Sequence, residues 1–365
     1  MLENTYYKLH HNKDFTVGFF GGSITLGTGA SDEERYSWRA RTREWLRETN
    51  PDVRVHEVNA SIGGTGSMFG AYRCDEELSQ YHPDLVFIEY ATNDGGKPYE
   101  HCITHMEAII RKLLIANPTC DIVLIYTMTT YSARDVEAGN PYDTRDAHRR
   151  VGYHYGLMQI DVGEPLHVAV IREGGDWVRY TKEGVHPNDE GYRICFEVVR
   201  DRMNEEFAKC EKNGVAGLTD HVMPAMLIEN NPRMNAHLVD IYQAETDGNW
   251  TRVNEALCGH YPHYLESDVP GATLRFPFHG TCVGLYLMMA LDAGNFEFRV
   301  DGGEWEKMGT FGMFCLDPYF AHVPTGWLMA EDLPLGDHIF EVRVLDEIPE
   351  HSIGKYLRFA AFLVC

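Results

Sequence analysis

Basic residues are scarce in this 365-residue chain, where 32 Lys and Arg stand against 55 Asp and Glu and leave a net charge of −23. We expect no nucleic-acid partner, because duplex binding needs a clustered basic surface that neutralises phosphates. We also expect no docking on anionic membranes, because these attract polybasic segments. The remaining composition, 44% hydrophobic and 24% charged, is typical of a globular chain and excludes wholesale disorder.

Long apolar runs are missing too. The N-terminal segment MLENTYYKLHHNKDF has no apolar core of the kind that a signal peptide needs. The longest uncharged apolar stretch, Val283–Leu291, is far shorter than the roughly 20 residues that span a bilayer. These absences predict a soluble, cytoplasmic protein without a membrane partner.

Cysteines with redox or zinc-binding spacing are also absent. The nine cysteines are scattered without a CxxC pair, and most lie in apolar runs where a small buried side chain is expected. His101 and His105 have the i, i+4 spacing of metal ligands on a helix, but the Glu of HExxH is missing. We therefore expect these histidines to have a packing or surface role, and we predict no metal and no cofactor.

Two patterns of secondary structure divide the chain. Up to about residue 216, short runs rich in Val, Ile and aromatic residues alternate with helical segments. This alternation predicts a doubly wound α/β domain around a parallel sheet. The predicted strands are 15–20, 53–58, 84–90 and 121–127, and the predicted helices are 36–49, 102–116, 146–154 and 189–212.

Past Gly214 the pattern changes to strands without intervening helices. Asp301-Gly302-Gly303 lies between two alternating runs, which is a hairpin signal. Several such strands predict an all-β sandwich. The boundary is placed between 215 and 235, which gives predicted domains of 1–220 and 221–365. The clearest predicted strands are 272–278, 281–289, 295–300, 338–345 and 355–364.

A glycine-rich turn, GGSITLGTG at 21–29, follows the first predicted strand. A dinucleotide fingerprint would need Gly where Asp32 stands, and a P-loop would need Lys where Thr28 stands. The lipase-type pattern GxSxG fails at Thr25, which disfavours an α/β-hydrolase. What remains is Ser23, at the sheet edge where open α/β folds place their sites.

His186 is the candidate base for this serine, whose hydroxyl is a weak nucleophile until a base takes its proton. It lies in TKEGVHPN, just before the last helix of the first domain, with Glu183 three residues upstream. The carboxylate can accept from one ring nitrogen while the other faces Ser23. Taken alone, such a pair is more often structural than catalytic.

Two further segments change that balance. NASIGGTGS follows the second predicted strand and EYATND follows the third, so both belong at the same sheet edge as Ser23. A glycine backbone N–H and the Asn93 side chain are neutral, directional donors of the kind that an oxyanion hole needs. A turn glycine and an Asx-turn asparagine are the alternatives. Together, after successive strands, these segments favour a hydrolytic site.

In this order the four segments resemble the blocks of the SGNH (GDSL-type) hydrolase superfamily, over about residues 15–210. GGSIT carries Ser23 with Gly-Gly-Ser in place of the usual Gly-Asp-Ser, and EGVHPNDEGY carries His186. The family normally has Asp three residues before this histidine, where the chain has Glu183.

The resemblance implies a flavodoxin-like three-layer fold and attack of Ser23 on an ester carbonyl. His186 would be the general base and then the acid, oriented by Glu183. The backbone amides of Ser23 and Gly64, with Gly63 as the alternative to Gly64, and the Asn93 side chain would hold the oxyanion.

The predicted sandwich resembles the jelly-roll, carbohydrate-binding modules that accompany carbohydrate esterases, and the whole layout is similar to intracellular acetylmannan esterases (carbohydrate esterase family 17). This implies a serine esterase that removes O-acetyl groups from plant-derived oligosaccharides, mannan ahead of xylan. Trp177 and Trp327 lie in turn-rich surroundings and are candidate sugar platforms, with packing as the alternative. A lipid or thioester acyl hydrolase of the same fold, a non-catalytic sugar-binding protein and a homodimer all stay open.

Overall fold

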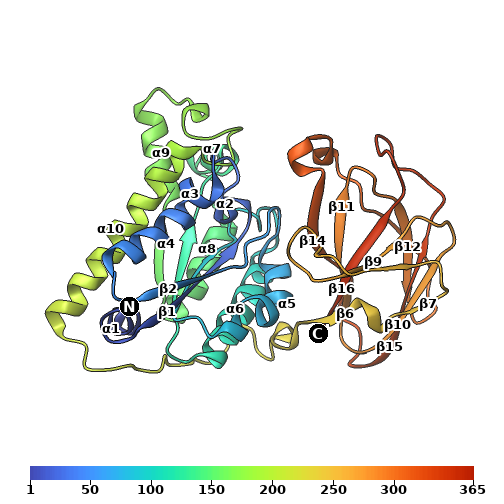
Figure 1. Cartoon of the computed structure of the whole chain (residues 1–365), viewed down its shortest axis with the longest axis horizontal. Coiled ribbons are helices and arrows are strands. Elements are labelled where there is room, and N and C mark those ends of the chain that lie inside the picture. Colours follow the sequence, from blue (N-terminus) through green and yellow to red (C-terminus); the bar gives the residue numbers. More distant parts are fainter. The chain divides into compact units, whose positions relative to one another are not determined.

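The computed structural model describes residues 1–365 apart from the side chain of Tyr319, and the chain divides into two compact units, Met1–Met234 and Asn235–Cys365 (Figure 1). The first unit extends past the predicted end at residue 220. The backbone N–H groups of Leu227 and Ile228 donate to the buried Glu107 carboxylate at 2.5 and 3.1 Å. These bonds keep the segment after the last helix of the first unit within that unit.

A sheet of five parallel strands forms the centre of the first unit. They are β1 (Asp14–Gly21), β2 (Arg54–Asn59), β3 (Leu85–Glu89), β4 (Asp121–Tyr126) and β5 (Met158–Asp161). Their order, β2-β1-β3-β4-β5, is the flavodoxin-like order, so the predicted α/β class is confirmed. β5 was not among the predicted strands, because its four residues, MQID, are too few and too polar to form a clear pattern.

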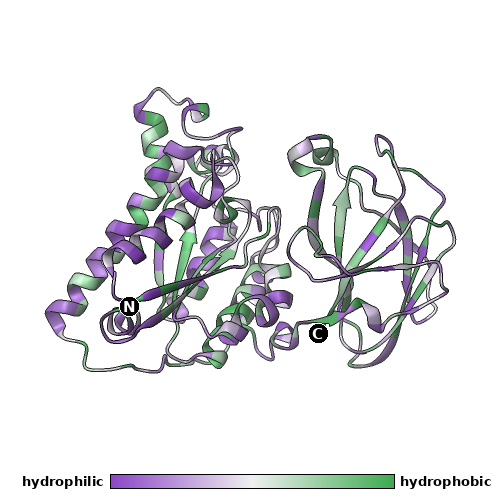
Figure 2. Cartoon of the chain, viewed as in Figure 1, coloured by the Kyte–Doolittle hydropathy of each residue, from purple (hydrophilic) through white to green (hydrophobic). Residues whose placement is uncertain are grey.

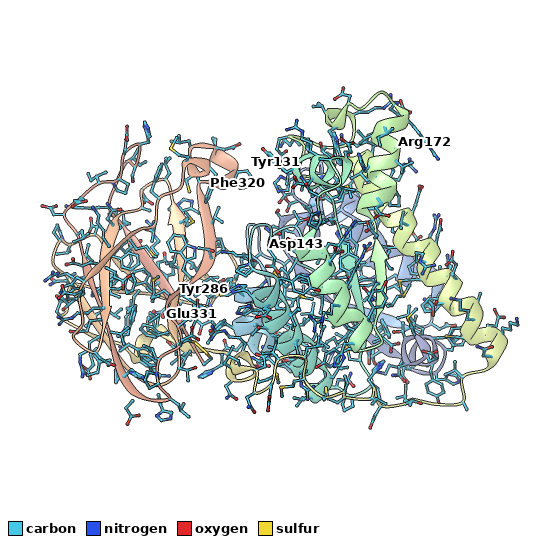
Figure 3. The ribbon with its side chains drawn as sticks, turned by 180° about the vertical axis from the view of Figure 1, so that it is seen from behind. Tyr131, Asp143, Arg172, Tyr286, Phe320 and Glu331 are labelled. Carbon is cyan, nitrogen blue, oxygen red and sulfur yellow. A yellow bond between two sulfur atoms is a disulfide. The ribbon has the colours of Figure 1, made fainter. Side chains whose placement is uncertain are left out.

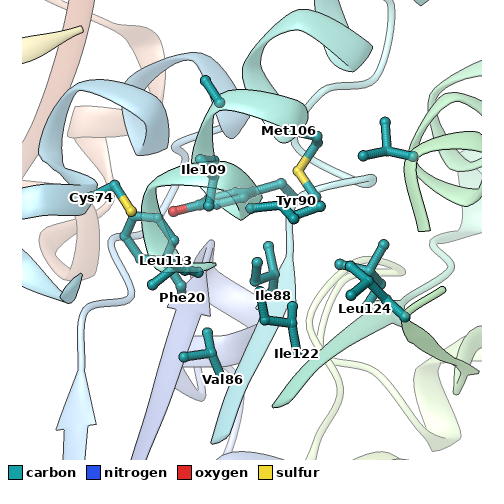
Figure 4. Packing of buried hydrophobic residues seen from close by; sticks show 14 of the residues in the cluster. Phe20, Cys74, Val86, Ile88, Tyr90, Met106, Ile109, Leu113, Ile122 and Leu124 are labelled. Carbon is teal, nitrogen blue, oxygen red and sulfur yellow. The ribbon is translucent and has the colours of Figure 1, made fainter. Parts of the chain in front are cut away.

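Helices cover both faces of this sheet. One face packs on α5, α6 and α8 through a cluster that includes Phe20, Val86 and Ile88 (Figure 4), and the other packs on α1, α4, α9 and α10 through Phe19 and Phe87. The helices are α1 (Glu3–His11), α2 (Ser23–Leu26), α3 (Glu33–Tyr36), α4 (Trp38–Thr49), α5 (Ser67–Glu77), α6 (Tyr99–Ala116), α7 (Thr130–Glu137), α8 (Asp143–His154), α9 (Gly163–Arg172) and α10 (Asp189–Asn213), with 3₁₀ turns at Ser79–Tyr81 and Trp177–Arg179.

Hydropathy follows these layers. Figure 2 shows hydrophobic residues concentrated in the central strands of the first unit, while much of α10 is hydrophilic. Among the described residues, no helix has both the length and the apolar character that crossing a membrane requires.

The second unit is a sandwich of two antiparallel sheets, as predicted. One sheet has the order β13-β12-β15-β10-β7, and the other β14-β11-β16-β9-β8, with β6 also paired to β16. The strands are β6 (His237–Asp240), β7 (Glu245–Thr246), β8 (Thr251–Val253), β9 (Tyr264–Ser267), β10 (Thr273–Gly280), β11 (Val283–Ala290), β12 (Asn295–Val300), β13 (Glu306–Gly309), β14 (His322–Ala330), β15 (Gly336–Val344) and β16 (Leu357–Val364). The short 3₁₀ turns of this region are Pro232–Asn235, Ile241–Gln243, Met313–Leu316 and Pro318–Phe320.

The hairpin predicted from Asp-Gly-Gly is present. Asp301 and Gly302 have φ angles of 53° and 69°, and the turn joins the antiparallel strands β12 and β13. Positive φ at successive turn residues matches the right-handed twist of the flanking strands, which is why Asp-Gly is favoured there.

Trp327 lies in a strand, so the turn-rich surroundings predicted for it are wrong. β14 runs through Trp327 and the preceding Pro324-Thr325-Gly326, and Trp327 pairs with Leu285 of β11. The half-buried indole packs against the core of the sandwich. Proline is accommodated here because β14 is the edge strand of its sheet, where one row of N–H groups needs no partner.

A disulfide joins Cys282 to Cys365 in the sandwich. No disulfide was predicted for this pair, because two cysteines separated by 83 positions leave no spacing signal. Of the free cysteines, Cys258 is exposed and the others are buried.

Candidate active site

The turn after β1 places Ser23 at the first position of α2, with its side chain largely buried. Close contacts on both sides restrict this turn to small residues. A side chain on Gly21 would collide with the Thr25 hydroxyl, and one on Gly22 would collide with the Asn93 amide. The usual Gly-Asp-Ser therefore cannot replace Gly-Gly-Ser here unless Asn93 moves.

Ser23, His186 and Glu183 form a continuous hydrogen-bonded chain, although 163 positions separate the serine from the histidine. His186 Nε2 lies 2.8 Å from Ser23 Oγ, and His186 Nδ1 contacts Glu183 Oε1. With Nδ1 protonated and donating to the carboxylate, Nε2 can accept the serine proton. The longer side chain of Glu183 thus reaches the ring as the usual aspartate would.

The loop that carries Glu183 and His186 is held at both ends. The Gly184 carbonyl accepts from the Thr130 backbone N–H at 2.7 Å and from its hydroxyl at 2.8 Å, which fixes the loop to the start of α7. At the other end, Asn188 caps α10 by accepting from the N–H groups of Glu190 and Gly191, both at 3.1 Å. These anchors hold the histidine beside Ser23.

The second and third segments also reach the serine. A Cβ built on Gly63 would lie 3.6 Å from Ser23 Cβ, whereas one on Gly64, at φ 73°, would have no atom within 4 Å. The Asn93 amide lies against Gly22, next to Ser23. These contacts bring Gly63 and the Asn93 amide next to Ser23 and its turn, and the part of Gly64 in the oxyanion hole stays a prediction.

Asp94, which sequence reasoning did not single out, ties these two segments together. Its carboxylate accepts from the Ser67 backbone N–H at 2.8 Å, from the Ser67 hydroxyl at 2.7 Å and from His148 Nε2 at 2.8 Å. It thereby caps α5, whose own N-cap Gly66 has no side chain. Burial alone would raise the pKa of Asp94, but the bonds from His148 and Ser67 hold it below its usual value. The signal for this role was the acidic residue that directly follows Asn93.

Among the described residues, Asp94, Cys102 and His148 offer ligand atoms within 4.8 Å of one another. Asp94 and His148 already bond to each other directly at 2.8 Å. Burial raises the pKa of the Cys102 thiol to about 12. The direct bond between Asp94 and His148 explains why these two side chains lie together, and the absence of a metal stays a prediction.

His101 and His105, the histidine pair on α6, lie in a packed part of the first unit. His105 is buried and donates from Nδ1 to the His101 carbonyl at 2.8 Å, while its Nε2 accepts from Arg233 Nε at 3.3 Å. Burial lowers the pKa of His105 to about 3 and keeps the ring neutral. Both of its ring nitrogens are therefore occupied by protein partners.

Trp177 lies beside a hollow of about 250 Å³ in the first unit. Its ring stacks on His167 with centroids 5.7 Å apart, and His167 Nε2 bonds Glu137 at 2.7 Å. The hollow is bordered by α7 and α9, which Figure 3 locates through Tyr131 at the start of α7 and Arg172 at the end of α9. Thr130, which anchors the histidine loop, also lines it.

Comparison with known proteins places this geometry in context. Residues 19–194 match the GDSL-like lipase/acylhydrolase family. An arylesterase from Vibrio mimicus is 32% identical over 107 residues, which are 29% of this chain and 50% of that protein. The chain thus matches about half the length of this curated relative.

Two solved structures share the whole fold. Both are of a two-domain esterase (CEX) active on acetylated mannans, one of them co-crystallised with mannopentaose. They cover 100% of this chain and 94% of their own, with TM-scores of 0.83 and 0.82 at 20% and 19% identity. Residues 19–194 of the chain therefore form a hydrolase domain of the GDSL-like (SGNH) family.

Proposed function

We propose that this protein is a carbohydrate O-acetylesterase that works through an acyl-enzyme. The observation that carries the proposal is the chain from Ser23 Oγ to His186 Nε2, at 2.8 Å, and from His186 Nδ1 to Glu183. This is the arrangement that activates a serine hydroxyl for acyl transfer, and the proposal needs no cofactor.

In the proposed reaction Ser23 Oγ attacks the acetyl carbonyl while His186 Nε2 takes its proton. The imidazolium is stabilised by the Glu183 carboxylate and then gives the proton to the departing sugar oxygen. The tetrahedral oxyanion is held by the Ser23 and Gly64 backbone amides, with Gly63 as the alternative to Gly64, and by the Asn93 side chain. Water, activated by the same histidine, releases acetate and restores Ser23.

Several observations support a sugar substrate. The fold of the entire chain matches that of an esterase active on acetylated mannans. Trp177 borders a hollow of about 250 Å³ that is also lined by Thr130, the residue that holds the loop of His186. Among sugar backbones, we favour mannan over xylan.

A lipid or thioester acyl hydrolase is the second candidate, because the same fold supports several acyl-transfer reactions. The partial match to an arylesterase favours small aryl esters among the substrates. A non-catalytic sugar-binding protein is disfavoured by the serine–histidine contact at 2.8 Å, which sugar binding alone does not need.

The test is to incubate the full chain with acetylated mannan and acetylated xylan oligosaccharides and to follow the loss of acetyl groups by mass spectrometry. We expect loss from both, faster from mannan, and none with Ser23→Ala. Activity on p-nitrophenyl acetate without any loss from either sugar would support the second candidate. Inactivity on all three substrates would refute the proposed esterase.

A further inference from the structure

Glu89, the last residue of β3, lies fully buried under the turn that carries Ser23. In the sheet it pairs with Gly21, two residues before the serine. One carboxyl oxygen accepts from the Thr25 hydroxyl at 3.0 Å and the other from the Thr127 hydroxyl at 2.8 Å. The backbone amide of Gly22 also interacts with the carboxyl group.

These contacts join two parts of the site that the sequence separates. Thr25 and Gly22 flank Ser23, whereas Thr127 shares a hydrogen bond of 2.6 Å with Thr92, the residue before Asn93. One buried carboxyl group therefore contacts the turn that carries the nucleophile and, through Thr127, the segment that carries an oxyanion donor. No step of the proposed acyl transfer uses Glu89 directly.

The two charge states of Glu89 make different hydrogen bonds. As a carboxylate it accepts from all of its donors at once. As a carboxylic acid one oxygen must itself donate, so at least one threonine hydroxyl has to turn away. Protonation of Glu89 therefore changes the network on which the turn rests.

Burial raises the pKa of Glu89 to about 7, against the opposing effect of the bonds from Thr127, Thr25 and Gly22. The titratable groups that face it are Asp94, whose negative charge adds to the rise, Cys195 of α10 and Tyr142, just before α8. Both charge states of Glu89 are thus accessible near neutral pH.

We propose that Glu89 is a positioning residue whose carboxylate form holds the Ser23 turn and the Asn93 segment in the reactive arrangement, so that one proton on Glu89 lowers activity. The proposal rests on the serine esterase function proposed above. It does not depend on which sugar is the substrate.

The test is the pH dependence of kcat/KM for acetate release from p-nitrophenyl acetate, which reports ionisations of the free enzyme. In the parent protein the general base and Glu89 must both be deprotonated, so the acid limb of log(kcat/KM) plotted against pH should approach a slope of two. Glu89→Gln keeps the shape of the side chain but cannot titrate. It should show a slope of one and a kcat about tenfold lower, with KM changed less than about twofold.

Glu107→Gln is the matched control. Glu107 is also fully buried in the first unit. Its carboxylate accepts from the backbone N–H groups of Leu227 and Ile228, in the segment after α10, rather than from the turn that carries Ser23. Its replacement should lower the melting temperature and leave the slope at two. A slope that changed equally in both variants would overturn the proposal, because general destabilisation would then explain it.

Thr127→Val provides a second variant in case Glu89→Gln does not fold. It removes one donor to the carboxylate, so the midpoint of the acid limb should move to higher pH. If Thr127→Val leaves the midpoint of the acid limb unmoved, the role of Glu89 is overturned. The same holds if the acid limb has a slope of one in the parent protein and in Glu89→Gln alike. Failure of the underlying function looks different, because hydrolysis would then persist in Ser23→Ala.

Discussion

In the first unit the buried side chains include Glu89, Asp94 and His148, each held by hydrogen bonds. The sandwich is different: its core is largely made of phenylalanine rings such as Phe276 and Phe362, stacked 3.7 Å apart. In the described part of the sandwich, the side chain of Tyr319 aside, the buried polar residues are Ser267, Thr310 and His338.

Burying a polar group costs free energy unless its hydrogen bonds are satisfied. Packing alone therefore does not explain why the first unit buries the hydrogen-bonded network of Glu89, Asp94 and His148. It surrounds the segments that meet at Ser23. The interior of the sandwich consists mainly of buried apolar side chains, which stabilise a fold without orienting reactive groups. From this contrast we infer that the first unit carries the proposed chemistry and that the sandwich contributes mainly stability. The following experiments test that inference.

The largest expected effect is on Ser23. Ser23→Ala should lower kcat on p-nitrophenyl acetate by roughly 10³–10⁶-fold with an unchanged melting temperature, because no other nucleophile is available in the proposed site. His186→Ala should fall to the same level, since the two groups act as a unit. A variant that kept a tenth of the activity would remove Ser23 from the mechanism.

A substitution in the sandwich core should do the reverse. Phe362 is fully buried and stacked on Phe276, so Phe362→Ala should cost about 3–5 kcal/mol in the unfolding of the second unit. The kcat of the folded protein on p-nitrophenyl acetate should stay the same. Urea unfolding and steady-state kinetics on one sample check both statements. A large fall in kcat at full folding would break the division of roles.

Two tryptophans sharpen the comparison further. Trp177→Ala should spare p-nitrophenyl acetate and lower kcat/KM on acetylated oligosaccharides by roughly ten- to thirtyfold, or about 1.4–2 kcal/mol, if the indole stacks on a sugar ring. For Trp327, whose ring packs on the sandwich core, the structure favours equal turnover of both substrates and lower stability. If Trp327→Ala lowered kcat/KM on acetylated oligosaccharides but not on p-nitrophenyl acetate, Trp327 would be a sugar platform after all.

The smallest expected effect concerns His338. Both of its ring nitrogens face acceptors, Asp301 Oδ2 at 2.7 Å and the Pro334 carbonyl at 2.8 Å, so only the doubly protonated ring donates to both. The hydrogen bond to Asp301, followed by that to Pro334, raises the pKa of His338 above its ordinary value.

Because this pKa is raised on folding, the stabilisation is complete below about pH 6.5 and is lost as the pH rises through the higher folded value. Calorimetry of the full chain from pH 6 to 9 should show the transition of the sandwich weakening, and His338→Gln should flatten that dependence. An identical dependence in both proteins would place the titrating group elsewhere.

The parts of the site that the sequence predicted are those with a local pattern. Ser23 and His186 lie in short blocks that keep their order, and β3 and β4 are continuous apolar runs. Glu89 and Asp94 were not predicted as network residues, because their partners Thr127 and His148 are distant in the sequence. Such pairings exist only once the sheet has brought the strand ends together.

The error at Trp327 has a different origin. Pro-Thr-Gly is typical of a turn, and local propensity alone gave that answer. Pairing of Pro324 with Met288 of β11 outweighed it, since an edge position makes the missing N–H of proline harmless. Tertiary context decides such cases, and a single sequence does not display it.

The Asp94 contacts also bear on how this protein could be redesigned. Because one carboxylate bonds both Ser67 and His148, the loop before α5, the loop after β3 and the helix α8 share a common anchor. Loop grafting from a relative would therefore have to transplant all three pieces as one module.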